Sequence, residues 1–403
     1  MNDLDHDIIV AGGGPAGTTA ATLLAQRGHR VLLIDRDRHP RFHIGESMLP
    51  MSEPVFKRLG IRWDKNEYLP KNGAEFIDEA AGISVRFPLA GQHQPFQVER
   101  AKFDHMMLTN AESHGVEVHQ QETVMDVACD ADKVSVRTDR STYWARYLID
   151  ATGRNALMGR RNKAIRRIEN LGKFSLYTHY GEVNAKAADT LFETGDVKIL
   201  IVDIGWFWII PMAGRRLSVG LVVQKEAAGQ QRGPALFERY LAASPLLTAA
   251  LQGAVREFDI RAEADFSFTN EIRHGLRFAC CGDAAGFLDP VFSSGVFLAV
   301  KTAEAVADRL HVALMENSEA NPDLHRVDDA AYQTGFNSMR FFVERFYHSG
   351  LVHNLFFVAE RSKELREDIL GLLAGDLWTG TNDFQRKLLG SRQARKLHAD
   401  CAR

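Results

Sequence analysis

The sequence predicts an α/β protein with an inserted antiparallel β-sheet and a helical C-terminal region. Three observations support this prediction. A strand, a glycine-rich turn and a helix follow one another at the N-terminus, residues 175–223 are rich in β-forming and aromatic residues, and the pattern is helical after Gly295. Because 403 residues exceed one average domain, we expect a large discontinuous domain interleaved with a second one.

The composition is that of an ordinary globular protein, with 45% hydrophobic and 25% charged residues. A formal net charge of −3 gives no general attraction to nucleic acid or to an anionic membrane. The N-terminus is polar and acidic, and charged residues interrupt the longest apolar stretches. We therefore expect a cytoplasmic protein with no membrane span and no nucleic-acid partner. Metal-type spacing is absent from the four cysteines, which are Cys129, Cys280, Cys281 and Cys401, so no metal site is expected.

The elements follow in order along the chain. Residues 7–11 form an apolar run typical of a buried parallel strand, residues 16–26 favour a helix, and residues 31–35 form a second strand. This is a Rossmann-like βαβ unit. Alternating β-rich segments cover 85–100 and 122–149, and a late strand at 277–281 is expected to return to the first sheet. Helices are expected at 296–316, 328–349 and 351–374.

The first turn carries a nucleotide-binding signal. Residues 12–17 fit the pattern G-x-G-x-x-G between a strand and a helix, through Gly12, Gly14 and Gly17. Glycines permit the tight turn and let backbone N–H groups, including that of Ala16, approach a pyrophosphate at the helix N-terminus. Asp35 ends the second strand, where a carboxylate accepts hydrogen bonds from a ribose diol. A dinucleotide site is predicted, against the alternative of a plain glycine turn.

Three further segments resemble flavoprotein hydroxylases. Residues 148–154 form a strand ending in Ala-Thr-Gly, like their second glycine signature, and residues 281–286 resemble their Gly-Asp motif. Residues 100–104 resemble their arginine segment. Together these segments are similar to the p-hydroxybenzoate hydroxylase-like FAD fold over roughly the first 310 residues. The resemblance implies that FAD contacts Asp283 and Arg100, whereas the alternative for Arg100 is a surface salt bridge.

The segment at 206–211 fits the W-x-W-x-I-P signature of flavin-dependent halogenases through Trp206, Trp208 and Pro211. Two indoles spaced by two residues on a strand point the same way and form a rigid apolar wall. In that family the motif is associated with keeping the substrate away from the flavin. The alternative is a pair of core aromatics in a sheet.

Residues 287–295 fit the family pattern F-x-x-P-x-x-S-x-G. A glycine-containing turn before a helix exposes N–H donors that can hold an anion. The resemblance implies that Ser294 and Gly295 lie near a halide and that Val296 lies against the flavin. Related hydroxylases have a similar flavin loop, so this segment supports FAD more strongly than halide.

Lys71 lies in the sequence Lys-Asn-Gly-Ala-Glu-Phe, which resembles the context of the halogenase lysine. The upstream segment 45–50, which contains Ser47, also fits, and it implies that Ser47 lies near the cofactor. The alternative for a single lysine is a solvated surface charge. The resemblance implies that Lys71 is catalytic.

The resemblance implies a chemistry that joins these parts. Reduced FAD (FADH2) reacts with O2 to give a C4a-hydroperoxide, chloride or bromide attacks it, and hypohalous acid passes through a closed tunnel to Lys71. The ammonium can polarise hypohalous acid by a hydrogen bond, or the amine can form a haloamine. The expected product is a halogenated electron-rich aromatic, as in antibiotic or other secondary-metabolite biosynthesis.

One departure from the family narrows the substrate. Tryptophan halogenases carry a glutamate at the position of Phe292, so free tryptophan is not expected as the substrate. The sequence Phe-Ser-Ser-Gly-Val resembles the branch that acts on phenols and pyrroles, some of them presented on an acyl or peptidyl carrier protein. Segments 341–347 and 370–376 also resemble that branch.

Two alternative functions remain open. The first is an aromatic monooxygenase or a prenyl-chain reductase of the same fold. The second, from a different class, is a non-catalytic flavin-binding protein. No second glycine fingerprint for NAD(P)H occurs, so reduced flavin is expected to come from a separate flavin reductase.

The discontinuous order of the expected elements along the chain predicts a domain division. We assign residues 1–80, 98–175 and 270–325 to a discontinuous FAD-binding domain. Residues 81–97 and 176–269 are assigned to a substrate domain with the antiparallel sheet, and residues 326–403 to a C-terminal helical region.

Overall fold

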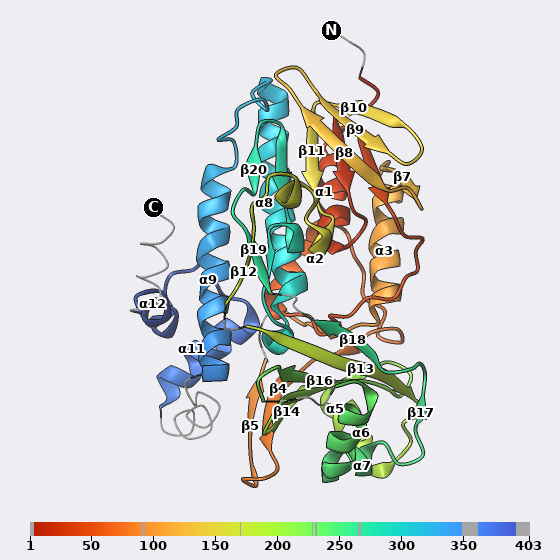
Figure 1. The fold of residues 1–403 in the computed structure, drawn as a ribbon, viewed down its shortest axis with the longest axis vertical. Coiled ribbons are helices and arrows are strands. Elements are labelled where there is room, and N and C mark those ends of the chain that lie inside the picture. The colour runs from red at the N-terminus through yellow and green to blue at the C-terminus, as the bar shows by residue number, and fades with distance from the viewer. Residues whose placement is uncertain are drawn as a thin grey trace.

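The computed structural model describes residues 4–89, 91, 93–169, 171–227, 229, 232–264, 267–348 and 362–391. Two large β-sheets lie one beyond the other along the long axis, and two long helices run along one side of the first (Figure 1). This arrangement confirms the predicted α/β fold with an inserted sheet.

The first sheet has six strands in the order β20-β21-β11-β1-β2-β7. All its pairings are parallel except that of β20 with β21. The strands at its centre are buried on both faces, which explains their continuous apolar sequences. The bounds are β1 (Ile8–Ala11), β2 (Val31–Asp35), β7 (Glu117–Gln120), β11 (Tyr147–Asp150), β20 (His274–Gly275) and β21 (Phe278–Cys280).

Helices cover this sheet. The helix α1 (Pro15–Ala25) packs against α3 (Arg100–Ser113) and against α8 (Ser294–Glu316), so segments far apart in sequence share one core. The predicted strands at 7–11, 31–35 and 277–281 and the first helix are confirmed to within a residue or two. Shorter elements nearby are α2 (Glu53–Arg58), α4 (Leu157–Arg161), β3 (Leu69–Pro70), β6 (Phe96–Gln97), β8 (Val124–Cys129), β9 (Val134–Thr138), β10 (Thr142–Ala145), β12 (Ile165–Arg167), β19 (Phe268–Asn270) and β22 (Gly286–Phe287).

The second sheet has eight strands, with the path β17-β13-β16-β15-β14-β4-β5 and β18 paired to β13. It is antiparallel except for the parallel pairing of β14 with β4. The helices α5 (Asp189–Thr194), α6 (Pro234–Ala243) and α7 (Pro245–Ala250) lie beside it (Figure 1). The strand bounds are β4 (Gly73–Asp78), β5 (Ile83–Pro88), β13 (Lys173–Gly181), β14 (Val197–Val202), β15 (Gly205–Met212), β16 (Arg216–Gln224), β17 (Val255–Arg256) and β18 (Arg261–Ala264).

The domain division remains a prediction, and β4 bears on it. This strand lies within 1–80, the range assigned to the FAD-binding domain, yet it pairs with β5 and β14 of the second sheet. The C-terminal region contains α9 (Arg326–His348), α11 (Lys363–Ala374) and α12 (Asp383–Leu389). Residues 351–361 of the last predicted helix lie outside the described residues.

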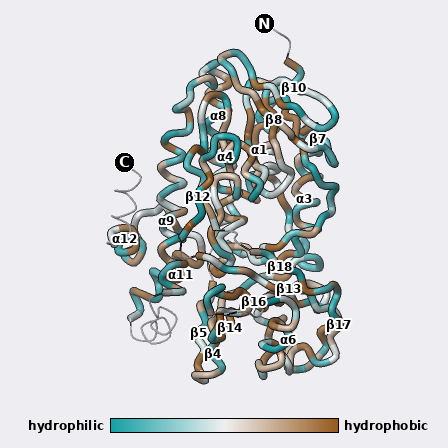
Figure 2. The backbone as a smooth tube through the Cα atoms, viewed as in Figure 1, coloured by the Kyte–Doolittle hydropathy of each residue, from teal (hydrophilic) through white to brown (hydrophobic). Residues whose placement is uncertain are grey.

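Apolar segments concentrate in the interior, and many exposed turns and outer helical faces are hydrophilic (Figure 2). No helix in the described part of the chain is both long and apolar enough to cross a membrane. Within the same residues, no group of three or more His, Cys, Asp or Glu side chains could hold a metal ion.

Candidate active site

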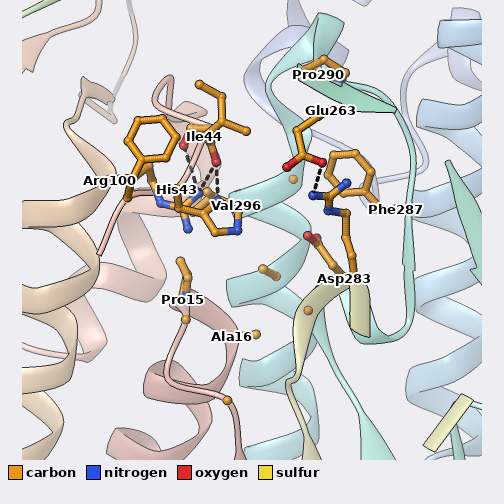
Figure 3. A pocket seen from close by; sticks show the side chains of 18 of the residues that line it. Pro15, Ala16, His43, Ile44, Arg100, Glu263, Asp283, Phe287, Pro290 and Val296 are labelled. Atoms are coloured by element: carbon orange, nitrogen blue, oxygen red, sulfur yellow. Dashed lines mark hydrogen bonds and ion pairs between the residues drawn. The ribbon is translucent and has the colours of Figure 1, made fainter. Parts of the chain in front are cut away.

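A cavity of about 580 Å³ lies between the two sheets. One wall comes from the turn after β1, the end of β2 and the start of α8. The opposite wall comes from β14 and β15 of the second sheet. In Figure 3, Pro15 and Ala16 lie on one side, Arg100 and Val296 lie near the middle, and Asp283 faces them from the neighbouring segment. The carboxyl ends of parallel strands therefore open into this cavity, where such sheets bind ligands.

At two positions of the glycine-rich turn, any side chain would clash with the neighbouring backbone. Gly12 has φ +110°, and a Cβ there would lie 2.2 Å from the carbonyl oxygen of Ala151. A Cβ on Gly17 would lie 1.8 Å from the carbonyl oxygen of Gly12. The turn and α1 therefore approach their neighbours too closely for any larger residue, and the turn lines the cavity.

Asp35 lines the cavity at the end of β2, as predicted for an acid that meets a ribose diol. Its carboxylate accepts hydrogen bonds from the backbone N–H groups of Gly13 and Asp37. Burial acts to raise the pKa of Asp35, but the nearby His39, these N–H donors and Arg41 together hold it below its ordinary value. The side chain is therefore ionised at neutral pH.

Arg100 and Asp283 both line the cavity. Arg100 is buried and donates to both carboxylate oxygens of Asp104, at 2.7 and 2.9 Å, and to the carbonyl of Ile44 at 2.8 Å. Arg100 therefore forms a salt bridge with Asp104, but this salt bridge is buried. The alternative that Arg100 serves only in a salt bridge on the protein surface is contradicted. Burial raises the pKa of Asp283 to about 6, against the opposing effect of Arg100 and Arg154.

The residues of the cavity fit FAD. An ionised carboxylate stands where a ribose would bind, and backbone N–H groups stand where a pyrophosphate would bind. The Oγ of Ser47 is buried on the cavity wall and has no hydrogen-bond partner among the residues that the structure describes. A buried hydroxyl without a partner is costly, which indicates a ligand group there. The aromatic wall beyond it suits a flat isoalloxazine.

Trp206 and Trp208 of β15 lie on that wall, with ring centroids 6.2 Å apart. The Nε1 of Trp208 donates to Ser218 Oγ at 3.0 Å, and that of Trp206 donates to the Tyr347 hydroxyl at 2.7 Å. Both indoles belong to the hydrophobic core as well, as the alternative explanation of the motif expects, and their role in keeping a substrate from the flavin stays a prediction. Pro211 is buried on the same strand but is not among the cavity-lining residues.

The start of α8 borders the cavity. Ser293 takes a left-handed conformation with φ +55°, after which the helix begins at Ser294. Gly295 and Val296 line the main cavity, whereas Ser294 and Gly295 line a small adjoining pocket of about 10 Å³. That volume suits a single water or small ion.

Lys71 lies between β3 and β4 and is 2% exposed, which excludes a solvated surface lysine. Its Nζ donates to the carbonyl of Met48 at 3.1 Å, next to the cavity-lining Ser47. Burial lowers the pKa of Lys71 to about 7, against the opposing charge of Asp196. Lys71 itself is not a lining residue of the cavity, so the segment 47–48 separates the amine from it.

Phe292 stacks on Phe342, with ring centroids 4.0 Å apart and planes 9° from parallel. No carboxylate is available at this position. Two residues of the site were not predicted from sequence. Asp289 lines the cavity and accepts a hydrogen bond from the hydroxyl of Tyr347 at 3.1 Å. Gly220 lies where a Cβ would be 2.1 Å from the Trp208 ring. The only sequence signal for it is a glycine inside a strand pattern.

Comparisons with known proteins agree with this geometry. The family described as FAD binding domain matches residues 5–327. The tryptophan 2-halogenase of Chondromyces crocatus is 32% identical over 310 residues, which are 73% of this chain and 59% of that protein. The chain thus spans about three fifths of that relative. The 1H-pyrrole-2-carbonyl-[peptidyl-carrier protein] brominase of Pseudoalteromonas luteoviolacea is 30% identical over 385 residues, which are 92% of each chain.

Two solved structures extend the comparison. The flavin-dependent brominase Bmp2 superposes with a TM-score of 0.85 and 25% identity, covering 98% of this chain and 99% of that one. The myxobacterial chondrochloren halogenase CndH gives a TM-score of 0.76 and 27% identity, covering 98% and 96%. A flavoprotein/dehydrogenase from Cytophaga hutchinsonii, at 24% identity and a TM-score of 0.86, shows the shared fold alone.

Proposed function

The chain belongs to the FAD binding domain family and, within it, to the flavin-dependent halogenases, and from this membership we propose which reaction it performs and with which residues. The enzyme uses FADH2, O2 and chloride or bromide to halogenate an electron-rich aromatic ring. A phenol or a pyrrole, free or tethered to a carrier protein, is the proposed substrate class.

The observation that carries this proposal is the buried amine of Lys71, which lies behind the wall of a cavity whose lining residues fit FAD. A pKa of about 7 makes both the ammonium and the amine available at neutral pH. A hydroxylase or a reductase of the same fold has no use for a desolvated amine behind the cavity wall. In a non-catalytic flavin-binding protein, the buried amine would lower the stability of the fold and serve no function.

The roles of the cavity residues follow from their positions. The N–H groups of the turn at Gly14 and Ala16 hold the pyrophosphate of FAD, and Asp35 holds a ribose. Gly12, whose own N–H donates to the carbonyl of Ile34, and Gly17 give the turn the close packing that this approach needs. Ser47, Arg100 and Asp283 contact the middle of the cofactor, and Val296 packs against the ring system. Ser294 and Gly295 hold the halide at the start of α8. When bound, the reduced cofactor would supply two electrons to O2, and the activated oxygen would then oxidise the halide to hypohalous acid with release of water.

Lys71 receives the hypohalous acid. As an ammonium, it donates a hydrogen bond that polarises the oxygen–halogen bond. As an amine, its Nζ attacks the halogen, the oxygen–halogen bond breaks, and the hydroxide leaves as water with a proton from the nitrogen, which gives a haloamine. The wall of Trp206 and Trp208, continued by Pro211, keeps the aromatic substrate away from the flavin and excludes water.

The substrate class rests on Phe292 and on the relatives. A stacked phenylalanine cannot act as a base, which favours rings activated by their own oxygen or nitrogen. The relative that matches over 92% of both chains acts, by its name, on a pyrrole held by a peptidyl carrier protein. We therefore include an acyl or peptidyl carrier protein among the proposed partners.

Product analysis tests the reaction. Purified protein, FAD, a flavin reductase, NADH, O2 and bromide are combined with a phenol or a carrier-bound pyrrole. We expect a product with the bromine isotope pair in its mass spectrum, and no bromination by Lys71→Ala, which still binds FAD. A gain of one oxygen instead of bromine, or full activity of Lys71→Ala, contradicts the proposal.

We also propose that reduced flavin arrives from a separate flavin reductase, which fits a cytoplasmic enzyme. The same assay without added reductase tests this point. NADH alone is expected to give no turnover. Turnover with NADH alone overturns the proposed partner but leaves the halogenation intact.

A further inference from the structure

In the loop before α8, position 292 carries a phenylalanine that stacks on Phe342, so this position offers Lys71 no carboxylate. The charged groups carried by the strands around Lys71 therefore decide how readily its amine holds a proton. Glu75 and Lys198 pair with each other across β4 and β14.

The register of β14 and β4 brings a different carboxylate close to Lys71. These strands run parallel with Val197 opposite Ala74, so Asp196 stands beside Gly73, two residues after Lys71. The Asp196 side chain is fully buried, at 0% exposed. One of its carboxylate oxygens lies 2.8 Å from where a Cβ on Gly73 would be. Because Gly73 has no side chain, the Asp196 carboxylate can occupy the space beside it.

A second residue fixes the orientation of that carboxylate. Arg86 of β5 donates to Asp196 through Nε at 2.6 Å and through Nη2 at 3.1 Å. The Lys198 Nζ lies 3.8 Å from the same carboxylate. Both oxygens are thus held in place, and part of their negative charge is balanced by Arg86, whose side chain is 41% exposed.

We propose that Asp196 is a positioning residue for Lys71, and that Arg86 sets how strongly its carboxylate acts on the ammonium. This inference rests on the proposed function, because it assigns Asp196 to the same reaction. Asp196 is the charge that opposes the effect of burial on Lys71. Without it, desolvation lowers the ammonium fraction at neutral pH several-fold, and the enzyme has correspondingly less of the hydrogen-bond donor that polarises hypohalous acid.

Two substitutions with opposite expected effects test this assignment. Asp196→Asn removes the anion and is expected to move the titration midpoint of Lys71 to lower pH by about 1 pH unit. Arg86→Gln removes the positive charge that partly neutralises the Asp196 carboxylate. The carboxylate then stabilises the Lys71 ammonium more strongly, and the titration midpoint of Lys71 is expected to move to higher pH. A residue with a purely structural role would not shift the two midpoints in opposite directions.

The midpoint is measured by NMR on protein labelled with ¹³C at lysine Cε, using the signal missing from Lys71→Ala. The matched control is Arg256→Gln. Arg256 pairs with Glu238 at the opposite edge of the same sheet, and its side chain is 37% exposed. This control is expected to leave the midpoint unchanged.

The outcomes separate the two hypotheses. Opposite midpoint shifts, matched by the pH profile of bromination, support the inference. Shifts in the same direction, or none, overturn it even if bromination is normal. Opposite midpoint shifts, together with no bromination by the wild type, leave the coupling intact but overturn the proposed function. If Asp196→Asn fails to fold, Arg86→Gln decides alone, and a midpoint that does not rise overturns the inference.

Discussion

The side chain of Lys71 shows how a functional residue can oppose folding. Burial removes the hydration of the Lys71 ammonium, and the hydrogen bond to the carbonyl of Met48 replaces only part of it. The pKa of Lys71 falls to about 7 for this reason. The unfolded chain, in which lysine is hydrated, therefore holds the proton more tightly than the folded chain does.

Replacing Lys71 with methionine should stabilise the protein while abolishing halogenation. Because the folded pKa lies below the ordinary value for lysine, the unfolded state binds more protons between these two values, and wild-type stability rises with pH across that window. The advantage of Lys71→Met is thus expected to be largest below pH 7 and to shrink by about 4 kcal/mol as the pH rises to 10.

Urea denaturation at several pH values measures this difference. Lys363→Met serves as the control, because the Lys363 side chain is 86% exposed, and it should change the free energy of unfolding by less than about 0.5 kcal/mol. A stability difference for Lys71→Met that stays constant from pH 6 to pH 10 would argue against a lowered pKa.

Site residues that belong to a local sequence pattern were predictable. The glycine turn, Asp35 and Lys71 each lie in a short segment whose spacing fits one backbone geometry. Asp196 and Tyr347 were not predictable in this way. Their partners lie more than a hundred residues away in sequence, at Arg86 and at Trp206. Only the strand register and the packing of a helix end bring them together.

At the scale of elements, β15 shows what alternation can predict. Trp206, Trp208 and Ile210 line the cavity, whereas Phe207 and Ile209 point to the core on the other face of the sheet. A period of two residues predicts this division from sequence. Period alone could not predict that β14 pairs in parallel with β4, because that pairing depends on how the chain crosses between strands.

The contact between β15 and α9 should carry a measurable coupling. The Tyr347 hydroxyl accepts from Trp206 Nε1 and donates to the carboxylate of Asp289, so it links the strand, the helix and the loop before α8. Trp206→Phe and Tyr347→Phe are each expected to lower the free energy of unfolding. The double variant should lose about 1 kcal/mol less than the sum of the two, because the second change removes a bond already broken.

A double-mutant cycle by urea denaturation at one pH measures that coupling. Pairing Tyr347→Phe with Lys363→Met provides a control cycle, since the Lys363 side chain is 86% exposed. The control pair is expected to be additive. Additivity in the Trp206 and Tyr347 cycle as well would show that this hydrogen bond contributes nothing to the joining of strand and helix.

On the scale of the whole molecule, the cavity is the place where the two sheets meet. Arg154, which follows β11, pairs with Glu263 of β18 at 2.7 Å on the cavity wall. Arg216 of β16 pairs with Glu99, which precedes α3, at 2.6 Å. A ligand bound between the sheets therefore touches both, and its binding free energy adds to the stability of the whole fold.

The glycine turn offers a way to separate that contribution from folding. A Cβ on Gly14 would have Arg41 Nη2, at 3.6 Å, as its nearest neighbour, so Gly14→Ala should fold with a change of less than about 1 kcal/mol. The added methyl group nevertheless stands in the cavity, where a pyrophosphate must approach the backbone.

FAD at 100 times its dissociation constant should stabilise the wild type by about 2.7 kcal/mol. At the same concentration, the variant should gain much less. Thermal unfolding over a series of FAD concentrations measures both gains, with Gly172→Ala expected to behave like the wild type. If FAD stabilises Gly14→Ala as much as the wild type, the pyrophosphate does not bind at this turn.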